Sequence, residues 1–233
     1  GPDAVGPMVT VRSDRPLAAC MAAQYAGWQV QRGDYFAMGS GPMRAAAGKE
    51  PLIDELGARE SSKVAVGVLE SRKLPTPEVC EYLAESCGVD PAGLTVLVAP
   101  TASLAGTVQV VARSLETALH KLHELKFDLK GMVSGYGCAP LPPVAKNDLV
   151  ALGRTNDAVL YGAQVTLWVQ AEDEQLAELV PQVPSCSSSD HGQPFADIFR
   201  RYDGDFYKID PHLFSPAVVT LVNLTTGQIH RRG

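Results

Sequence analysis

The chain has 233 residues, 45% of them hydrophobic, so it can bury the core of one large domain or of two small ones. Its formal net charge of −6 and its lack of clustered lysine and arginine argue against a nucleic acid partner. Its apolar runs are strand-sized, well below the roughly 20 residues that span a bilayer, so we expect no transmembrane helix.

The cysteine pattern indicates a reducing compartment. Five widely spaced cysteines show no C-x-x-C pair and no zinc-ligand spacing: Cys20, Cys80, Cys87, Cys138 and Cys186. Residues 1–8 lack the charged start and the apolar stretch of a secretory signal peptide. We therefore interpret the cysteines as reduced thiols and expect a cytoplasmic protein.

The first half of the chain predicts short helices and strands. Small residues over 17–26 favour a helix that Gly27 ends. Apolar runs and terminator residues then predict strands over 35–38, 64–69 and 94–99, a glycine turn at 39–42, and helices over 43–47 and 77–87. The runs at 64–69 and 94–99 are apolar throughout, so we expect these two strands to be buried on both faces.

The second half begins with the longest periodic segment of the chain. Apolar residues recur at helical spacing from about residue 101 to residue 125, and we expect one continuous helix. Glycine and proline predict a strand end and a long loop over 130–143, and the residues at 148–157 look irregular or briefly helical. Strands over 164–170 and 217–223, helices over 172–180 and 195–202, and a hairpin turn at 225–227 complete the prediction.

These elements favour an α+β fold with mixed β-sheets layered with helices. Strands and helices alternate without the strict βαβ rhythm of a nucleotide-binding fold. Neither a G-x-G-x-x-G motif nor a P-loop motif is present, and no repeat recurs at a period of 20 to 50 residues.

Arg113 and Glu116 form the most informative polar pair. Residues three apart on a helix share a face, so a guanidinium can orient a carboxylate that acts as general base toward water. From spacing alone, an exposed ion pair is the more frequent meaning of such a pattern. Glu116, His120 and His123 also lie on adjacent turns, which leaves a metal-dependent hydrolase as a weaker alternative, because no H-E-x-x-H motif accompanies them.

Other polar residues have a structural and a functional interpretation. Backbone N–H groups at Ser40 and Gly41 can bind an anion at a helix start, or the segment is an ordinary turn. Glu70 ends a strand, where layered α/β folds often form crevices, or it is a plain exposed carboxylate. The segment 154–157 suits recognition of a polar heterocycle, or it is a loop bonded to itself.

Several long segments, in this order, resemble the methenyltetrahydromethanopterin cyclohydrolase family. They are AAQYAGWQV, DYFAMGSGPMRA, LVAPTASLAGTVQVVARSLETALHKL, GRTNDAVLYG, DFYKIDPHLFSPA and TTGQIH. The resemblance covers nearly all of residues 1–233. It implies an α+β enzyme of two related subdomains with a pterin-binding cleft between them, although the sequence does not place their boundary.

The resemblance also implies the reaction and the assembly. The expected activity is reversible hydrolysis of 5,10-methenyltetrahydromethanopterin to the 5-formyl compound in one-carbon metabolism, either formaldehyde oxidation or methanogenesis. This reaction opens a C–N bond of a cyclic amidine. The resemblance implies no metal and no separate cofactor, since the tetrahydromethanopterin derivative is the substrate, and it implies a homotrimer.

By the family motif, Glu116 corresponds to the catalytic carboxylate and Arg113 to its partner. The substrate-binding residues that the resemblance implies are Glu70, Ser40, Gly41, Thr101, Ser103, Arg154, Asn156, Asp157 and Lys208. The chain departs from the family where Tyr25 stands in place of a lysine of some relatives. Family members also carry segments before residue 1 and after residue 233, so we expect a chain incomplete at both ends, and a non-catalytic pterin-binding or scaffold protein is the alternative function.

Overall fold

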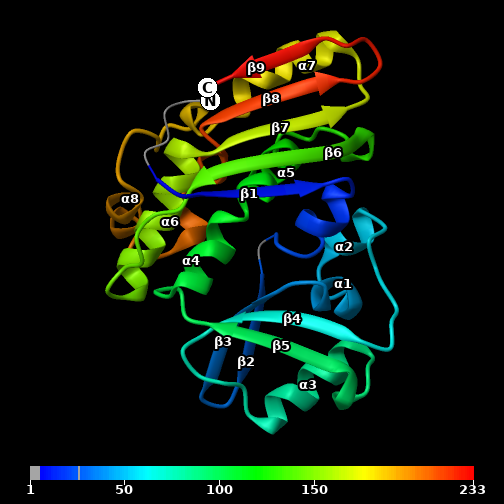
Figure 1. Cartoon of the computed structure of the whole chain (residues 1–233), viewed down its shortest axis with the longest axis vertical. Helices are drawn as coiled ribbons and strands as arrows, with labels where there is room; N and C mark the ends of the chain where they lie inside the picture. Colours follow the sequence, from blue (N-terminus) through cyan, green and yellow to red (C-terminus); the bar gives the residue numbers. More distant parts are fainter. Residues whose placement is uncertain (1–5, 26) are drawn as a thin grey trace. The chain divides into compact units, whose positions relative to one another are not determined.

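A computed structural model describes residues 6–25 and 27–233, apart from the side chain of Tyr207. The chain forms two compact units, which we describe separately. The smaller unit comprises residues 17–101, and the larger unit comprises residues 6–16 together with residues 102–233. Figure 1 labels the elements of both units.

The smaller unit contains a four-stranded mixed sheet in the order β2-β3-β4-β5. The pairs β2–β3 and β3–β4 are antiparallel, and β4–β5 is parallel. The strands are β2 (Trp28–Arg32), β3 (Tyr35–Ser40), β4 (Ala65–Glu70) and β5 (Leu94–Ala99), and the helices are α1 (Met43–Ala47), α2 (Pro51–Glu55) and α3 (Pro77–Cys87). A π-helical turn, η1 (Leu17–Met21), and a 3-10 turn, η2 (Pro91–Gly93), complete the unit.

One face of this sheet packs against α1 and α3. The apolar side of α3 joins buried residues of the strands in one hydrophobic core, which includes Val79, Leu83 and Leu69. Side chains of the opposite face are exposed, with Leu97 58% exposed. The prediction that residues 64–69 and 94–99 are buried on both faces was therefore wrong, because the helices of this unit cover only one side of the strands.

The larger unit contains a five-stranded mixed sheet in the order β1-β6-β7-β8-β9. Only the pair β7–β8 is parallel. The strands are β1 (Met8–Ser13), β6 (Met132–Pro140), β7 (Gln164–Val169), β8 (Val218–Asn223) and β9 (Ile229–Arg232). The helices are α4 (Leu104–Val111), α5 (Ser114–Glu124), α6 (Asp148–Gly162), α7 (Asp173–Leu179) and α8 (Phe195–Arg201). The 3-10 turns are η3 (Leu129–Gly131), η4 (Val180–Gln182), η5 (Ser185–Ser187), η6 (Phe206–Lys208) and η7 (Pro211–Leu213).

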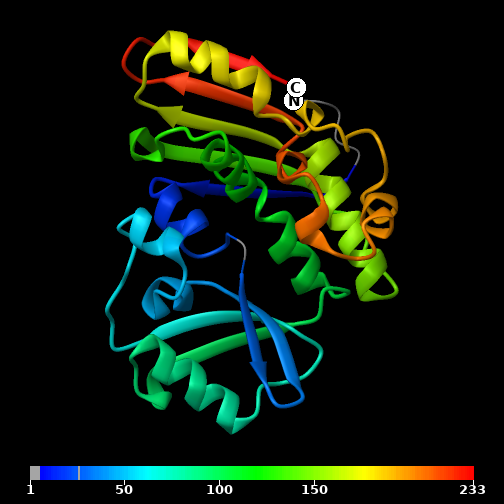
Figure 2. The same cartoon turned by 180° about the vertical axis from the view of Figure 1, so that it is seen from behind.

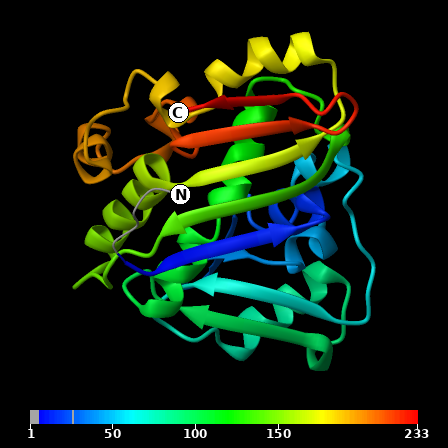
Figure 3. The same ribbon diagram turned by 45° about the horizontal axis from the view of Figure 1, so that its top comes forward.

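Helix α5 packs on one face of this larger sheet. It contacts β1, β6 and β7, and it lies behind the strands in Figure 1 and in front of them in Figure 2. Four apolar side chains of α5 are fully buried there: Leu115, Ala118, Leu119 and Leu122. Figure 3 shows the opposite face of the five strands, from β1 to β9.

The structure corrects three predictions in the larger unit. The expected continuous helix over 101–125 is broken at Ala112 and Arg113, where α4 ends and α5 begins. The segment 130–143, expected to be a strand end followed by a long loop, is largely β6, a nine-residue strand that pairs with both β1 and β7. The segment 148–157, expected to be irregular or briefly helical, lies within the 15-residue helix α6, whose first turn Asn147 caps by accepting from the N–H of Val150.

Most other elements were predicted correctly. The strands β3, β4, β5, β7 and β8, the helices α1, α3, α7 and α8, and the β8–β9 hairpin are confirmed. The helix expected over 17–26 is only a short π-helical turn, and position 26 lies outside the described residues. Strands β1 and β2 were not predicted.

The α+β class with mixed sheets is confirmed, and the two sheets share a pattern. In each sheet, four neighbouring strands pair antiparallel, antiparallel and parallel, as β2-β3-β4-β5 and as β1-β6-β7-β8. This repetition agrees with two related subdomains. A search of the described helices finds none with the length and apolar character needed to cross a membrane.

Candidate functional site

Glu116 lies in the first turn of α5, and its side chain is only 4% exposed. This burial excludes the solvent-exposed ion pair that the spacing alone favoured. Arg113 precedes the helix as its N-cap residue and is partly exposed. Its guanidinium donates a hydrogen bond to Oε1 of Gln109 at 3.3 Å, so the arginine also connects the start of α5 with α4.

Two glycines of β6 allow the start of α5 to approach the sheet closely. A Cβ atom at Gly137 would lie 2.7 Å from Oγ of Ser114, and one at Gly135 would lie 2.6 Å from Cδ1 of Leu115. At Gly137 such a Cβ atom would also lie 3.1 Å from the backbone nitrogen of Leu115, so a larger residue would displace the helix, whereas at Gly135 the side chain of Leu115 would have to move. The position of Glu116 therefore depends on the absence of a side chain at Gly137.

Ser114 is a polar residue that the sequence did not single out. Its side chain is fully buried beside Gly137. Its Oγ is one of the few buried polar side-chain atoms that lack a hydrogen-bond partner in the part of the chain that the structure describes. An unsatisfied buried hydroxyl two residues before a buried carboxylate is unusual. Its proximity to Gly137 indicates that close packing takes precedence here over hydrogen bonding.

In the smaller unit, Glu70 and Thr101 come together as a hydrogen-bonded pair. Glu70 ends β4, and the parallel partner strand β5 ends at Ala99, directly opposite in register. Thr101, two residues further on, donates from its hydroxyl to Oε1 of Glu70 at 2.5 Å. Two residues that the family resemblance implied separately thus meet at the carboxyl ends of adjacent parallel strands, where α/β sheets commonly bind ligands.

Ser40 and Gly41 form a tight turn between β3 and α1. Gly41 has a φ of +93°, and a Cβ atom there would lie 3.2 Å from the main-chain oxygen of Val66. The N–H of Gly41 donates to the main-chain oxygen of Ala23 at 2.7 Å. This N–H is therefore engaged within the unit, which favours the interpretation as an ordinary turn over an anion-binding site.

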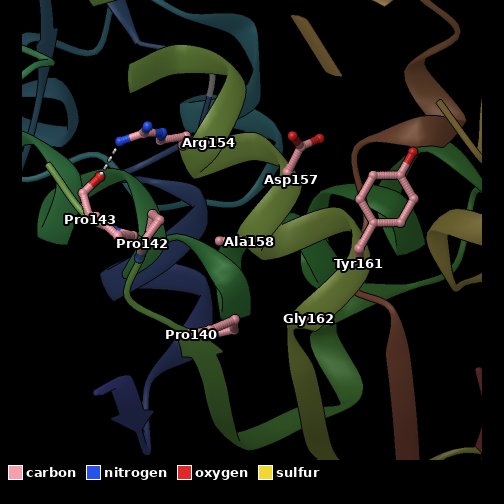
Figure 4. Close-up of a pocket in the computed structure, with 8 residues that line it drawn as sticks. All are labelled: Pro140, Pro142, Pro143, Arg154, Asp157, Ala158, Tyr161 and Gly162. Carbon is pink, nitrogen blue, oxygen red and sulfur yellow. Dashed lines mark hydrogen bonds between the residues drawn. The ribbon is translucent and has the colours of Figure 1, made fainter. Parts of the chain in front are cut away.

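The polar residues of the segment 154–157 lie on α6, and each makes a structural contact. Arg154 donates to the main-chain oxygen of Pro143 at 3.1 Å, as the dashed line in Figure 4 marks. The side-chain amide of Asn156 donates to the main-chain oxygen of Leu152 at 2.9 Å. Asp157 accepts from the N–H of Phe195 at 2.8 Å. Burial raises the pKa of Asp157 above its usual value, although this hydrogen bond opposes the increase.

Arg154 and Asp157 also line an open hollow of about 590 Å³, which Figure 4 shows. The hollow is mostly apolar and lies between α6 and the proline-rich segment that follows β6. Its residues are Pro140, Pro142, Pro143, Arg154, Asp157, Ala158, Tyr161 and Gly162. The structure thus brings Arg154 and Asp157 to one hollow, whereas Asn156 bonds to its own helix.

The two remaining predicted contacts lie apart from this hollow. Ser103 caps α4 by accepting from the N–H of Gly106 at 2.9 Å. Lys208 ends the 3-10 turn η6 and has an exposed side chain. The substrate contacts expected of Ser103 and Lys208 stay predictions.

The metal alternative finds no support in the side-chain geometry. Among the described residues, no group of three histidine, cysteine, aspartate or glutamate side chains is arranged to hold a metal ion. Nε2 of His120 instead lies 3.5 Å from Oε1 of Glu124, one turn further along α5. Burial lowers the pKa of His120 to about 4 despite the opposing effect of Glu124, so the imidazole is neutral near pH 7.

Comparisons with known proteins agree with one another. The sequence profile of the cyclohydrolase (MCH) family matches residues 2–233. A methenyltetrahydromethanopterin cyclohydrolase of Rhodopirellula baltica is 54% identical over 99% of this chain and 71% of its own length. Proteins with the same name from Methylobacillus flagellatus and Methanosarcina mazei are 50% and 45% identical, each over 94% of this chain and over 67% and 69% of their own lengths.

Proposed function

The chain belongs to the cyclohydrolase (MCH) family, and from this premise we propose that it hydrolyses 5,10-methenyltetrahydromethanopterin to 5-formyltetrahydromethanopterin, reversibly. The main support is the identity of about half of all residues, over nearly the whole chain, to relatives named for this activity. The burial of Glu116 at a helix start adds a local reason, because a general base works best where bulk water is excluded.

The chemistry requires little more than a positioned base. The carbon between N5 and N10 of the substrate is a cationic amidinium and already electrophilic. Water attacks this carbon while Glu116 accepts a proton from the water, which leaves a neutral hydroxyl adduct. The C–N10 bond then breaks, N10 takes up a proton, and the hydroxyl loses its own proton to become the N5-formyl oxygen. In the net reaction one water is consumed and one proton is released.

The negative charge of Glu116 also favours binding of the cationic bridge. In this proposal Arg113 orients the carboxylate, and Glu70 and Thr101 offer a hydrogen-bonded pair to the polar pterin. No step of this proposal needs a metal or a cofactor separate from the pterin substrate. A cytoplasmic location and a homotrimeric assembly belong to the same proposal and stay predictions.

The decisive experiment replaces Glu116 with glutamine, which keeps the shape of the side chain and removes the base. We expect kcat to fall by about 10²–10⁴-fold, since this is the usual contribution of a general base. The measurement is the loss of absorbance of methenyltetrahydromethanopterin, with circular dichroism to verify the fold.

Glu124→Gln is the matched control, because Glu124 lies on the same helix and has no part in the proposed step. Near-normal turnover by Glu116→Gln would contradict the assignment of the base. Binding of the pterin to the wild-type protein without conversion, measured by calorimetry, would favour the non-catalytic alternative.

A further inference from the structure

A lysine lies in the interior of the larger unit, on the helix that carries Glu116. Lys121 belongs to α5, and only 1% of its surface is exposed. Fully buried amino groups are rare, because the protein must replace the water that a charged group loses. The reaction proposed above makes no use of this group, so its burial needs a separate explanation.

The ammonium group of Lys121 connects α5 to residues 170–217, the connection between β7 and β8 that we call the long crossover. Nζ donates to Oγ of Ser187 at 3.0 Å and to the main-chain oxygen of His212 at 2.7 Å. Ser187 ends the 3-10 turn η5, and His212 lies in the middle of η7. One side chain therefore holds two separate turns of the long crossover on the helix.

Charged and titratable groups face Lys121 from both turns and from its own helix. Asp210, before η7, and Cys186, in η5, both favour the charged ammonium. His120, adjacent on α5, is neutral near pH 7 for the reason given above. Nδ1 of His212 is buried without a hydrogen-bond partner among the described residues. Asp210 is therefore the group that supplies negative charge to this buried ammonium.

Asp210 is itself held within the long crossover. Its carboxylate accepts from Oγ of Ser188 at 2.6 Å and from the N–H of His212 at 2.9 Å. Burial opposes ionisation, but these hydrogen bonds outweigh it, and the pKa of Asp210 lies below its usual value. The N–H of Asp210 donates to the buried carboxylate of Asp190 at 3.4 Å. The carboxylate of Asp190 also accepts from the hydroxyl of Tyr202 at 3.0 Å. Lys121 thus joins α5 to a continuous polar network.

We infer that Lys121 is a positioning residue, which holds the long crossover against α5 so that Glu116 keeps its place. This inference rests on the proposed function. An apolar side chain of similar length would fill the same space without burying a charge, so packing alone does not require a lysine. What the lysine adds is a pair of directed hydrogen bonds and an attraction to Asp210.

A dependence on pH follows from the burial. Burial lowers the pKa of Lys121 to about 8, although Asp210 and Cys186 oppose the shift. As the pH rises through this value, the amino group loses its charge and its attraction to Asp210. Because this value lies below the ordinary lysine pKa of 10.5, release of the long crossover would let the amine rebind its proton, so the crossover should be held more firmly as the pH rises from 8 to 10. A carboxylate base such as Glu116 produces a decline of turnover on the acid side.

The test compares Lys121→Met and Lys121→Gln with the wild-type protein, with kcat and KM measured from pH 6 to pH 10. For Lys121→Met we expect kcat to fall about tenfold and KM to change less than about twofold. Lys121→Gln keeps hydrogen-bond donors without charge, so it should recover part of kcat relative to Lys121→Met. Lys130→Met is the control, because Lys130 is exposed on η3.

A kcat of folded Lys121→Met within about twofold of the wild-type value, or no recovery of kcat in folded Lys121→Gln, would overturn the inference. If both variants unfold, as judged by circular dichroism, hydrogen exchange of the wild-type protein decides. If the wild-type protein does not convert the pterin, the proposed function fails, and hydrogen exchange tests the positioning role separately. Protection of residues 185–191 and 209–215, corrected for the intrinsic exchange rate, should then rise between pH 8 and pH 10 in the wild-type protein, and unchanged or falling protection would contradict the positioning role.

Discussion

The two sheets share one pairing pattern but differ in how their parallel strands are connected. Residues 71–93 join β4 to β5 and contain the single helix α3, whose apolar side enters the core of the smaller unit. The long crossover joins β7 to β8, is about twice as long, and contains α7, α8 and several 3-10 turns. Buried polar side chains help to fix it, because Ser185 and Ser188 donate hydrogen bonds from their hydroxyls and Asp190 accepts one.

This difference shows how one sheet pattern supports two kinds of stability. A short connection built on an apolar helix face depends on packing and is largely independent of pH. A long connection held by buried polar groups depends on their charge and on complete hydrogen bonding. We therefore expect the larger unit to respond more strongly to substitution and to pH than the smaller unit does.

The largest expected effect comes from adding a methyl group beneath a helix. Gly137→Ala would place Cβ against Oγ of Ser114 and 3.1 Å from the backbone nitrogen of Leu115, which cannot move alone. We expect a loss of about 3 kcal/mol in the free energy of unfolding and at least a tenfold loss of turnover. Chemical denaturation measures the free energy of unfolding, and the absorbance assay measures turnover.

Gly67→Ala is the counterpart in the smaller unit. Its Cβ would meet the side chain of Met43, which is flexible and can change rotamer, so we expect a smaller loss of about 1–2 kcal/mol. Equal losses for the two variants would show that the packing on β6 is no more constrained than the packing on β4.

An intermediate effect is expected on acidification. His120 has a folded pKa of about 4, below the value of about 6.5 in an unfolded chain, so the unfolded state binds the proton first as pH falls. Stability should therefore be complete above about pH 6.5 and should decrease by about 1–2 kcal/mol at pH 5. His120→Gln should reduce this decrease, as measured by denaturation at both pH values.

His123→Gln is the matched control, since His123 lies about one turn further along the same helix. A pH dependence of unfolding that is identical in the wild-type protein and in His120→Gln would show that other groups cause the acid sensitivity.

The smallest effect is expected from Thr101→Val in the smaller unit. This change removes the hydroxyl that donates to Glu70 and leaves a side chain of similar shape. We expect a loss of about 1 kcal/mol in the free energy of unfolding. Thr95→Val, on the exposed side of β5, should change stability by less than about 0.5 kcal/mol. If both variants behave alike, the Glu70–Thr101 hydrogen bond contributes nothing measurable.

The sequence predicted those elements whose ends carry their own signals. Thr76 and Gly88 bound α3 as cap residues, and the structure shows both caps. Strand β6 was missed because Gly135 and Gly137 resemble loop residues locally. Their role is to admit α5, which is a constraint of packing that no local pattern reveals.

The candidate site was predictable only in part. The meeting of Glu70 and Thr101 follows from the ends of adjacent strands, once those strands are known to be parallel. Lys121 was missed, because a lysine within an amphipathic helix usually points to solvent. Its burial depends on Ser187 and His212, which lie far away in the sequence.

The interruption between α4 and α5 has a consequence for anyone who redesigns this segment. A continuous helix would place Glu116 near the middle, whereas the break places it in the first turn, where the helix dipole interacts favourably with an anion. Replacing the residues of the break to regularise the helix would therefore strengthen a local propensity and remove an electrostatic advantage from the carboxylate. At this point an apparent imperfection in helical geometry is worth preserving.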